Sequence, residues 1–396
     1  MGYRKPNIFC YRLAQAVSFL VAKTVFKRKI LRNEIKGKKG PFVVIANHQA
    51  ALDFVNIIGA TNTPMSFVIS NSFYNSLPIT KFFDKLGVIP KQQFQTSPKD
   101  MRAIKEVINK GQPLVIYPAG LMCEDGLSTP IPAATYKFLK WLGADVYVAK
   151  TFGTYFAMPK WSRGMRPGKT YLDIYKLFGA QELKTADVAE IKRKTDEALL
   201  FDAYREQEKL LVKYKKQNNI EGLQNVLYMC PHCKAEFSMK IRNGNSICCD
   251  KCGFEEESDI FGFLHKKSDI GNEIRYVSDW SKLIFENEKA RLQKGENLSI
   301  SKDTEIHKID YKKHKFFCVG KGNVTLSDSG FVINGNIEED EKEINISIHG
   351  IPTLPFTPGK HFEIQQGSDI YRCVLKDGKL VMKFINMVKI FYELSS

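Results

Sequence analysis

Two Cys-x-x-Cys pairs constrain the fold of this chain more tightly than any other feature of its sequence. The first pair is Cys230 and Cys233, the second is Cys249 and Cys252, and fifteen residues separate the two pairs. Four thiolates at this spacing complete a closed tetrahedral zinc site, which leaves no open position for a substrate. We therefore predict a structural zinc ion here, with Cys249 rather than the adjacent Cys248 as a ligand.

This module resembles a zinc ribbon, a small fold that binds nucleic acid or protein, or that only stabilises the chain. Residues 234–242 and 246–247 would form its hairpin, with the turn at residues 243–245. Five of the nine cysteines lie in this one short window, and the others are scattered. Such clustering indicates metal binding in a reducing compartment rather than a disulfide framework.

The length and the charge of the chain bound its class. With 396 residues it has room for two or three domains, each with its own core. The formal net charge of +16 makes an anionic membrane surface and nucleic acid the two obvious partners. Nucleic acid is the less favoured partner, because the basic residues are spread along the chain without an aromatic–basic binding motif.

The first apolar segment, residues 8–26, is a poor candidate for a spanning helix, which needs about 20 residues with few charges. It contains Arg12 and Lys23 and then meets a basic run at residues 27–29, and no small-residue cleavage site follows it. We predict an amphipathic helix in the membrane interface, with an ordinary core helix as the alternative. The side chains expected to face lipid are Phe9, Leu13, Ala16, Phe19, Leu20 and Val21.

Short apolar runs alternate with helical patterns between residues 40 and 215, which predicts a parallel or mixed sheet flanked by helices. Ser97 is a natural cap for one of the helices, with Pro98 at its first position. Strands are expected at residues 41–46, 66–70, 88–89, 114–117, 145–150 and 170–175, and helices at 49–59, 79–86, 97–109, 133–142 and 186–216.

The first of these strands ends in a polar turn that presents His48, and Asp53 follows five residues later. Imidazole is the side chain best able to take a proton at neutral pH, and a carboxylate bonded to its other nitrogen would fix its tautomer. Positions i and i+5 of one helix lie about 140° apart, so His48 is expected to precede the first helical turn. A buried histidine beside a solvated helix-start aspartate is the alternative interpretation.

A second apolar strand, residues 114–117, leads into a loop with proline, glycine and two acidic residues. Ligands of open α/β sheets gather at the carboxyl ends of strands, and both this loop and His48 follow strands. Taken alone, the loop is equally compatible with a plain connection.

Together these stretches resemble the glycerolipid acyltransferases of the 1-acylglycerol-3-phosphate (lysophosphatidate) type. Asn47 and His48 with Asp53 match the His-x4-Asp motif of that family. Residues 117–120, Tyr-Pro-Ala-Gly, resemble its later block, usually Phe-Pro-Glu-Gly-Thr-Arg-Ser. The motifs keep the order of the family over roughly residues 10–215, which is far more specific than any single motif.

The resemblance implies direct acyl transfer from an acyl thioester, carried by CoA or by acyl carrier protein, to a hydroxyl of a lysophospholipid or related lipid. His48 would deprotonate the hydroxyl and Asp53 would orient the imidazole, while backbone N–H groups near Gly120 would help to hold the oxyanion. Cys123 as a covalent nucleophile is a weaker alternative, because the family uses none. The residues expected to contact substrate are Asn47, Lys91, Tyr117, Pro118 and Gly120.

The chain departs from the family at the residues associated with holding glycerol phosphate. Ala119 replaces the glutamate of the later block, Met122 replaces its arginine, and Lys91 or Gln93 stands where the intermediate block ends in arginine. Arginine binds phosphate bidentately, whereas methionine offers no such contact. We expect acyl transfer with an altered grip on the acceptor, and the main alternative is a catalytically altered relative that binds lipid.

From residue 299 the pattern changes to short alternating strands that follow a predicted helix at residues 278–292. The pattern resembles a pleckstrin-homology (PH) or GRAM-like barrel, which would bind a lipid headgroup or a protein, and a small β-domain that only packs on its neighbour is the alternative. The expected strands are residues 304–309, 315–319, 323–326, 330–333, 343–348, 361–365 and 370–375, followed by a helix at 379–393.

The sequence thus predicts an α/β acyltransferase domain with a mixed sheet flanked by helices, then a zinc ribbon and a mostly-β C-terminal domain. We expect the protein in the cytoplasm, associated peripherally with the cytoplasmic face of the membrane. The expected segments are an amphipathic membrane-associating helix at 1–30, the acyltransferase domain at 31–225, the ribbon at 226–260, a helical linker at 261–297 and the PH/GRAM-like domain at 298–396.

Overall fold

The computed structural model describes residues 4–94, 97–216, 218–296, 299–367 and 369–395. The chain divides into two compact units. The first consists of Met1–Pro159 with Gly164–Lys215, and the second of Lys160–Arg163 with Lys216–Ser396. The expected border between residues 297 and 298 lies outside the described residues, and the other segment borders remain predictions.

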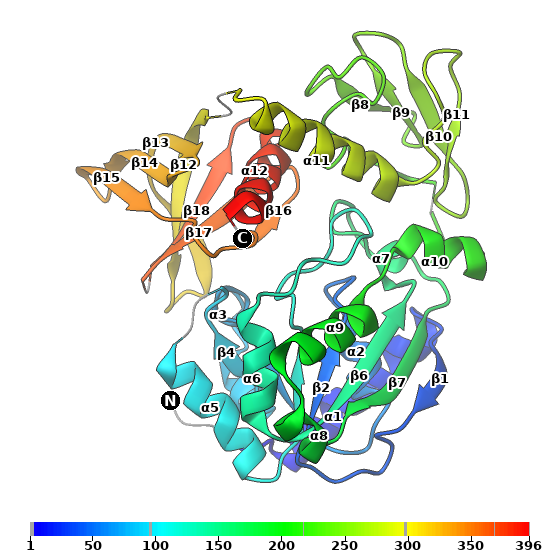
Figure 1. Ribbon diagram of the computed structural model, residues 1–396, viewed down its shortest axis with the longest axis vertical. Coiled ribbons are helices and arrows are strands. Elements are labelled where there is room, and N and C mark those ends of the chain that lie inside the picture. The colour runs from blue at the N-terminus through cyan, green and yellow to red at the C-terminus, as the bar shows by residue number, and fades with distance from the viewer. Residues whose placement is uncertain (1–3, 95–96, 217, 297–298, 368, 396) are drawn as a thin grey trace. The chain divides into compact units, whose positions relative to one another are not determined.

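The first unit is built on a seven-stranded mixed sheet with helices around it, as the alternation of patterns predicted (Figure 1). Its strands are β1 Lys29–Asn33, β2 Phe42–Ala46, β3 Ser66–Ser70, β4 Ile89–Lys91, β5 Leu114–Ile116, β6 Asp145–Phe152 and β7 Tyr171–Phe178. The order in the sheet is β1-β7-β6-β2-β5-β3-β4. Strands β6, β2, β5, β3 and β4 run parallel, whereas β7 is antiparallel to β6. The carboxyl ends of five strands therefore share one edge of the sheet.

The helices of this unit are α1 Ile8–Thr24, α2 Asp53–Ile58, α3 Asn71–Asn75, α4 Thr80–Lys85, α5 Pro98–Asn109, α6 Ala134–Leu142, α7 Thr154–Ala157, α8 Ala180–Thr185, α9 Val188–Leu199 and α10 Ala203–Leu210. Each expected helical segment of this unit contains a helix, but the first after β2 begins at Asp53 rather than at residue 49, and the short helices α3, α7 and α8 were not expected. Ser97 caps α5 with Pro98 at its start, as predicted. The single helix expected over residues 186–216 is wrong, because Leu200 is extended and Asp202 accepts the N–H groups that begin α10.

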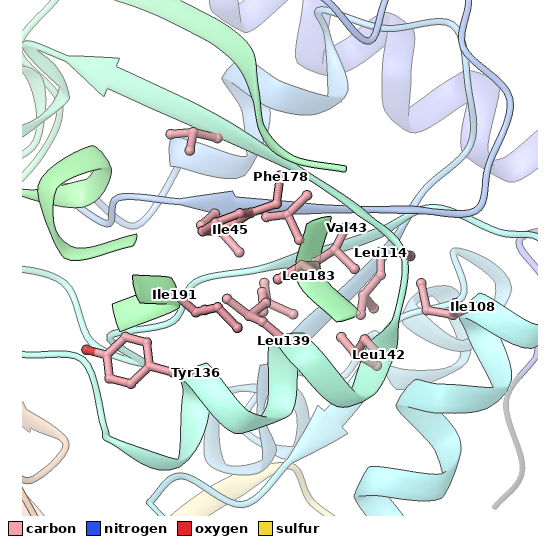
Figure 2. Close-up of a cluster of buried hydrophobic side chains, with 14 of the residues drawn as sticks. Val43, Ile45, Ile108, Leu114, Tyr136, Leu139, Leu142, Phe178, Leu183 and Ile191 are labelled. Atoms are coloured by element: carbon pink, nitrogen blue, oxygen red, sulfur yellow. The ribbon is translucent and has the colours of Figure 1, made fainter. Parts of the chain in front are cut away.

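The core of the first unit lies on both faces of β2. Val43 and Ile45 point to one face, where α5, α6 and α9 supply side chains such as Ile108, Leu139 and Ile191 (Figure 2). The alternate residues of β2, Phe42, Val44 and Ala46, point to the other face, which α2 covers with Ile57 and Ile58. All five residues of β2 are buried. This strand is therefore a fixed support for the loop that follows it.

Helix α1 leaves a row of apolar side chains exposed. Phe9 is 78% exposed, and Leu13, Phe19 and Leu20 are each more than half exposed. Tyr11 and Ala22 are buried, so the helix has one face on the protein and one face outward. Among the described residues, none of the helices is both long and apolar enough to cross a membrane.

The second unit begins with the cysteine pairs and a four-stranded antiparallel sheet. Its strands are β8 Met239–Arg242, β9 Ser246–Cys249, β10 Glu255–Ser258 and β11 Leu264–Lys266, in the order β11-β10-β9-β8. The turn between β8 and β9 has Asn243 and Gly244 at positive φ, which suits a tight hairpin and confirms the expected turn. The predicted helix after it is α11, Val277–Gln293.

The rest of the second unit is a seven-stranded antiparallel sheet followed by a helix. Its strands are β12 Ile300–Asp310, β13 Lys315–Ser327, β14 Gly330–Ile337, β15 Asp340–Ile346, β16 Phe356–Thr357, β17 His361–Gln366 and β18 Asp369–Leu375, and the helix is α12 Leu380–Ser395. The order is β15-β14-β13-β12-β18-β17-β16. Two of the expected strands form one continuous strand, β13, and β16 was not expected. The PH/GRAM-like identity remains a prediction.

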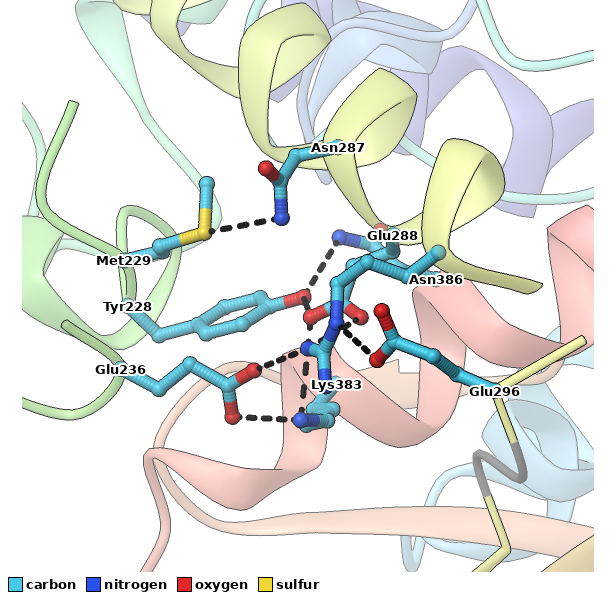
Figure 3. A network of polar contacts seen from close by, with 9 residues as sticks. Tyr228, Met229, Glu236, Asn287, Glu288, Glu296, Lys383 and Asn386 are labelled. Carbon is cyan, nitrogen blue, oxygen red and sulfur yellow. Dashed lines mark hydrogen bonds and ion pairs between the residues drawn. The ribbon is translucent and has the colours of Figure 1, made fainter. Parts of the chain in front are cut away.

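A buried polar network joins the cysteine-rich part of this unit to α11 and α12 (Figure 3). Glu288 of α11 is fully buried, and its carboxylate accepts a hydrogen bond from Tyr228 and lies 3.7 Å from the Lys383 ammonium. Lys383 also pairs with Glu236, and Arg291 pairs with both Glu236 and Glu288. Each buried charge has an opposite charge beside it, as burial requires.

Candidate active site and metal site

The polar turn after β2 places His48 beside Asp53. Asp53 is the first residue of α2, and His48 precedes that helix, as the sequence predicted. His48 Nδ1 lies 3.1 Å from Asp53 Oδ2. The Asp53 side chain is fully buried, whereas the His48 side chain is 20% exposed. One edge of the imidazole is thus held inside the protein while part of the ring remains accessible.

Two backbone groups fix the Asp53 carboxylate in this position. Oδ2 also accepts the N–H groups of Gln49 at 2.7 Å and Ala50 at 2.9 Å. These donors, and the start of α2, compensate a buried negative charge. An ionised carboxylate can only accept, so Nδ1 of a neutral His48 carries the hydrogen and Nε2 carries the lone pair. This is the tautomer that a base acting through Nε2 requires.

Asn47 links the turn to the end of β6. Its side-chain amide donates to Thr151 O at 2.8 Å, and its oxygen accepts from Thr151 N–H at 2.8 Å and from the Thr151 hydroxyl at 3.1 Å. The Asn47 side chain is buried. These contacts position the loop, and the expected contact of Asn47 with substrate remains a prediction.

Gln49 makes a second set of links, which sequence reasoning missed. Its side-chain oxygen accepts from the Thr154 hydroxyl at 3.1 Å and from Tyr155 N–H at 3.3 Å, at the start of α7. Its amide donates to Glu206 of α10 at 3.4 Å. Burial raises the pKa of Glu206 to about 7, although the charge of Lys150 opposes the shift. The position of Gln49 next to His48 was a usable signal, whereas nothing in the sequence marks Glu206.

Tyr117 covers one face of the imidazole. The ring centroids of His48 and Tyr117 are 4.3 Å apart, with the planes inclined by 30°. The Tyr117 hydroxyl is enclosed and has no hydrogen-bond partner among the described residues. Burial, and then the charge of Asp53, raise the pKa of Tyr117 well above its usual value, so the hydroxyl stays protonated. The loop after β5 thus packs against His48, because β2 and β5 are adjacent and parallel and their following loops lie at the same edge of the sheet.

The rest of this loop is held by its own contacts. Gly120 has a positive φ of 71°, its N–H donates to Tyr117 O at 2.9 Å, and its carbonyl accepts from Gln93 at 2.6 Å. Its N–H therefore already has a partner. Cys123 N–H donates to His48 O at 3.1 Å, and burial raises the pKa of the Cys123 thiol well above its usual value. A buried neutral thiol is a poor nucleophile, which disfavours Cys123 in that role.

Lys91 lies at the same edge of the sheet but not beside His48. It ends β4, which is separated from β2 by β5 and β3, so about 14 Å divides the two strands at the usual spacing. The Lys91 ammonium donates to Gln92 O at 2.8 Å, and burial lowers its pKa. The structure therefore brings His48, Asp53 and Tyr117 together and leaves Lys91 further along the edge.

The four predicted zinc ligands converge in the second unit. The sulfur atoms of Cys230 and Cys252 are 3.7 Å apart, those of Cys233 and Cys249 are 3.8 Å apart, and all four lie within 4.8 Å of one another. Four sulfurs about 2.3 Å from one tetrahedral zinc ion would be about 3.8 Å apart, so this donor set fits the ion. Cys249 and not Cys248 belongs to this group, as expected from the spacing, and its role as a metal ligand remains a prediction.

Comparison with known proteins finds a family match for part of the first unit. Residues 25–154 match the model of the family described as Acyltransferase, and this range includes the His48–Asp53 pair and the loop of Tyr117. No curated protein sequence matches the chain. The crystal structure of the 1-acyl-sn-glycerophosphate (LPA) acyltransferase PlsC from Thermotoga maritima is similar over 51% of this chain and 79% of that one, at 18% identity and a TM-score of 0.42. On the strength of the family match, residues 25–154 are an acyltransferase domain and the protein is an acyltransferase enzyme.

Proposed function

We propose that this enzyme transfers a fatty acyl group from an acyl thioester to a hydroxyl of a lysophospholipid or related lipid, with His48 as the general base. The observation that carries the proposal is the 3.1 Å contact between His48 Nδ1 and Asp53 Oδ2 inside the acyltransferase domain. A histidine so oriented is suited to take a proton from a hydroxyl at neutral pH. The burial of Asp53 and the partial exposure of His48 suit these two roles.

In the proposed reaction His48 Nε2 takes the proton of the acceptor hydroxyl as its oxygen attacks the thioester carbonyl. The carbon–sulfur bond then breaks, the ester forms, and the proton on His48 passes to the departing thiolate. Asp53 keeps the imidazole in the required tautomer and stabilises the imidazolium that forms transiently. Tyr117 packs on the ring and limits its rotation. No covalent acyl-enzyme is needed, in agreement with the neutral thiol of Cys123.

The remaining substrate contacts are proposals from the sequence resemblance. Lys91 would supply one cationic contact to the acceptor, and Pro118 and Gly120 would shape the loop beside it. Ala119 and Met122 replace residues that hold glycerol phosphate in the family, so the acceptor headgroup differs or is held by other groups. CoA and acyl carrier protein both remain candidate carriers of the acyl group.

We also propose that α1 places the enzyme on the cytoplasmic face of an anionic membrane. Its exposed Phe9, Leu13 and Phe19 offer the apolar face that interfacial binding requires. Arg28, in the basic run at residues 27–29, does not face outward, because its guanidinium donates to the Asn56 and Gly59 carbonyls at the end of α2. Lys27 and Lys29 flank it and are exposed. Anionic lipid would therefore be drawn to these two lysines.

In the second unit we propose that Cys230, Cys233, Cys249 and Cys252 hold a structural zinc ion. A site with four protein ligands supplies no chemistry, so its contribution is to fold stability. The seven-stranded sheet with its C-terminal helix supports the proposed PH/GRAM-like domain, which would bind a lipid headgroup or a protein.

The test is the release of thiol from acyl-CoA or acyl carrier protein by the full chain with a panel of lysolipids. We expect His48→Ala to lower the rate on the order of 10³-fold. His265→Ala is a matched control, because His265 lies 3.0 Å from Asp259 in the second unit, and it should keep wild-type activity. Activity that survives His48→Ala would refute the base. Lipid binding without thiol release by the wild type would favour a catalytically altered lipid-binding protein.

A further inference from the structure

A second group of metal-ligating side chains lies on the large sheet of the second unit. His307 of β12 is directly opposite Cys318 of β13, and Glu305 precedes His307 by two residues on the same strand. One ligand atom from each residue lies within 4.8 Å of the other two. The strand register shifts between Ile306 and His307. Such bulges re-aim side chains and are common next to functional sites.

The distances within the group fit a bound metal ion. His307 Nε2 and Glu305 Oε2 are 3.2 Å apart. An imidazole nitrogen and a carboxylate oxygen, each about 2.0–2.1 Å from one tetrahedral ion, would be about 3.3 Å apart. The Cys318 thiol lies within 4.8 Å of both atoms and would supply a third ligand. The set combines one soft, one intermediate and one hard ligand, which suits Zn²⁺ or a neighbouring first-row cation.

The surroundings leave this group accessible and electrostatically suitable. Cys318 is exposed, although cysteine is among the most frequently buried residues. Its thiol donates to Gly320 O at 3.3 Å, and it would lose that proton to solvent on binding a metal. Arg372 of β18 is the register partner of His307 on β12. Its guanidinium lies 2.6 Å from Glu363 and 3.4 Å from the centre of the Phe316 ring, so its charge is already matched.

We propose that Glu305, His307 and Cys318 form a second metal site that binds a divalent first-row cation such as Zn²⁺. Three protein ligands leave a fourth position for water or for an anionic group. This site would differ in kind from the four-cysteine site, which is closed by its own ligands. Binding would release the Cys318 thiol proton to solvent.

The test is the metal stoichiometry of the full chain. Protein loaded with Zn²⁺ at the four cysteines is dialysed against a weak chelator and then titrated with Co²⁺, and thiolate-to-cobalt absorption is recorded. We expect one further equivalent, and at least about tenfold weaker binding in His307→Ala and Cys318→Ser, because even the loss of an outer contact costs 10–100-fold. Glu305→Gln should weaken binding less than either of these.

Cys10→Ser is the matched control, because Cys10 is the other cysteine outside the pairs that is not buried. It should bind the further equivalent like the wild type. Circular dichroism would show that each variant is folded, as expected for substitutions on the sheet surface. The proposal is overturned if the wild type takes up no further equivalent, or if both His307→Ala and Cys318→Ser bind it unchanged.

Discussion

The His48–Asp53 site and the four-cysteine site both consist of ionisable side chains, but they differ in how far those side chains are enclosed. The cysteine site closes on itself within residues 230–252, and its four sulfur atoms face one another. The His48 site gathers groups from the ends of β2, β5 and β6 and from α10, and it leaves the imidazole one-fifth exposed. As proposed, the cysteine site would enclose a metal ion, whereas the His48 site would keep one imidazole nitrogen accessible to substrate.

The difference lies in what stabilises each site. Thiolates held close together repel one another unless an ion lies between them, so the cysteine site would depend on the proposed zinc ion. Asp53 Oδ2 already contacts two backbone N–H groups and His48 before any substrate arrives, although Oδ1 has no hydrogen-bond partner among the described residues. We therefore expect the cysteine site to fail by unfolding and the His48 site to fail by losing rate while the fold persists.

The largest effect is expected from breaking the cysteine site. Cys230→Ser removes one of four ligands, and metal binding by small zinc modules contributes about 10–16 kcal/mol of apparent free energy. We expect loss of the bound metal in elemental analysis and an early unfolding transition in calorimetry. Cys248→Ser is the control, because Cys248 is buried next to Cys249 but lies outside the ligand group. A variant at Cys230 that keeps the metal would contradict the closed site.

The next effect is that of the Asp53→Asn substitution. The amide oxygen of the new side chain would still accept the Gln49 and Ala50 N–H groups, but the side chain would no longer hold the imidazole in the required tautomer. We expect a loss in the rate of thiol release on the order of 10³-fold with a small change in melting temperature. Asp100→Asn is a matched control in the first turn of α5. A drop in stability as large as the drop in rate would mean that Asp53 is structural.

The two sites also differ in how much of each could be predicted from the sequence, because one comes from a short segment and the other from distant segments. The four converging cysteines were found by spacing alone, because short-range geometry fixes a pair of turns. The His48–Asp53 pair and the edge of the sheet followed from motif and strand order. Glu206 and Thr154 could not be predicted from the sequence, because they contact Gln49 only in the assembled fold. The prediction of one long helix at 186–216 was wrong because Asp202 caps a new helix within this charge-rich stretch.

A smaller effect would separate the two roles open to Asn47. If the side chain positions the loop, Asn47→Ala leaves buried Thr151 groups unpaired, and stability falls by about 2–3 kcal/mol together with kcat. If it contacts substrate, KM rises and the melting temperature stays near that of the wild type. Thr151→Val keeps the two backbone contacts of Asn47 and removes the hydroxyl contacts to Asn47 at 3.1 Å and to Thr154 at 3.4 Å, so it should cost about 1 kcal/mol. We expect the first outcome, measured by steady-state kinetics and thermal unfolding.

The smallest effect is one of pH at Glu206. Burial raises the pKa of this carboxyl from 4.5 to about 7, against the charge of Lys150 and the amide of Gln49, while Asp202 adds to the shift and Lys209 opposes it. A raised carboxyl pKa means that the folded state favours the protonated form. The stability contributed by Glu206 is therefore fully present below about pH 4.5 and is lost as the pH rises through about 7.

Glu206→Gln keeps a neutral side chain at every pH, so it should match the wild type at pH 5 and exceed it at pH 8 by about 2 kcal/mol, or about 5 °C in melting temperature. Glu208→Gln, at an exposed position of the same helix, should show no such pH dependence. If the difference in melting temperature between the wild type and Glu206→Gln is the same at pH 5 and pH 8, the Glu206 carboxyl is solvated. The hydrogen bond from Gln49 to α10 would then contribute nothing to holding the His48 turn in place.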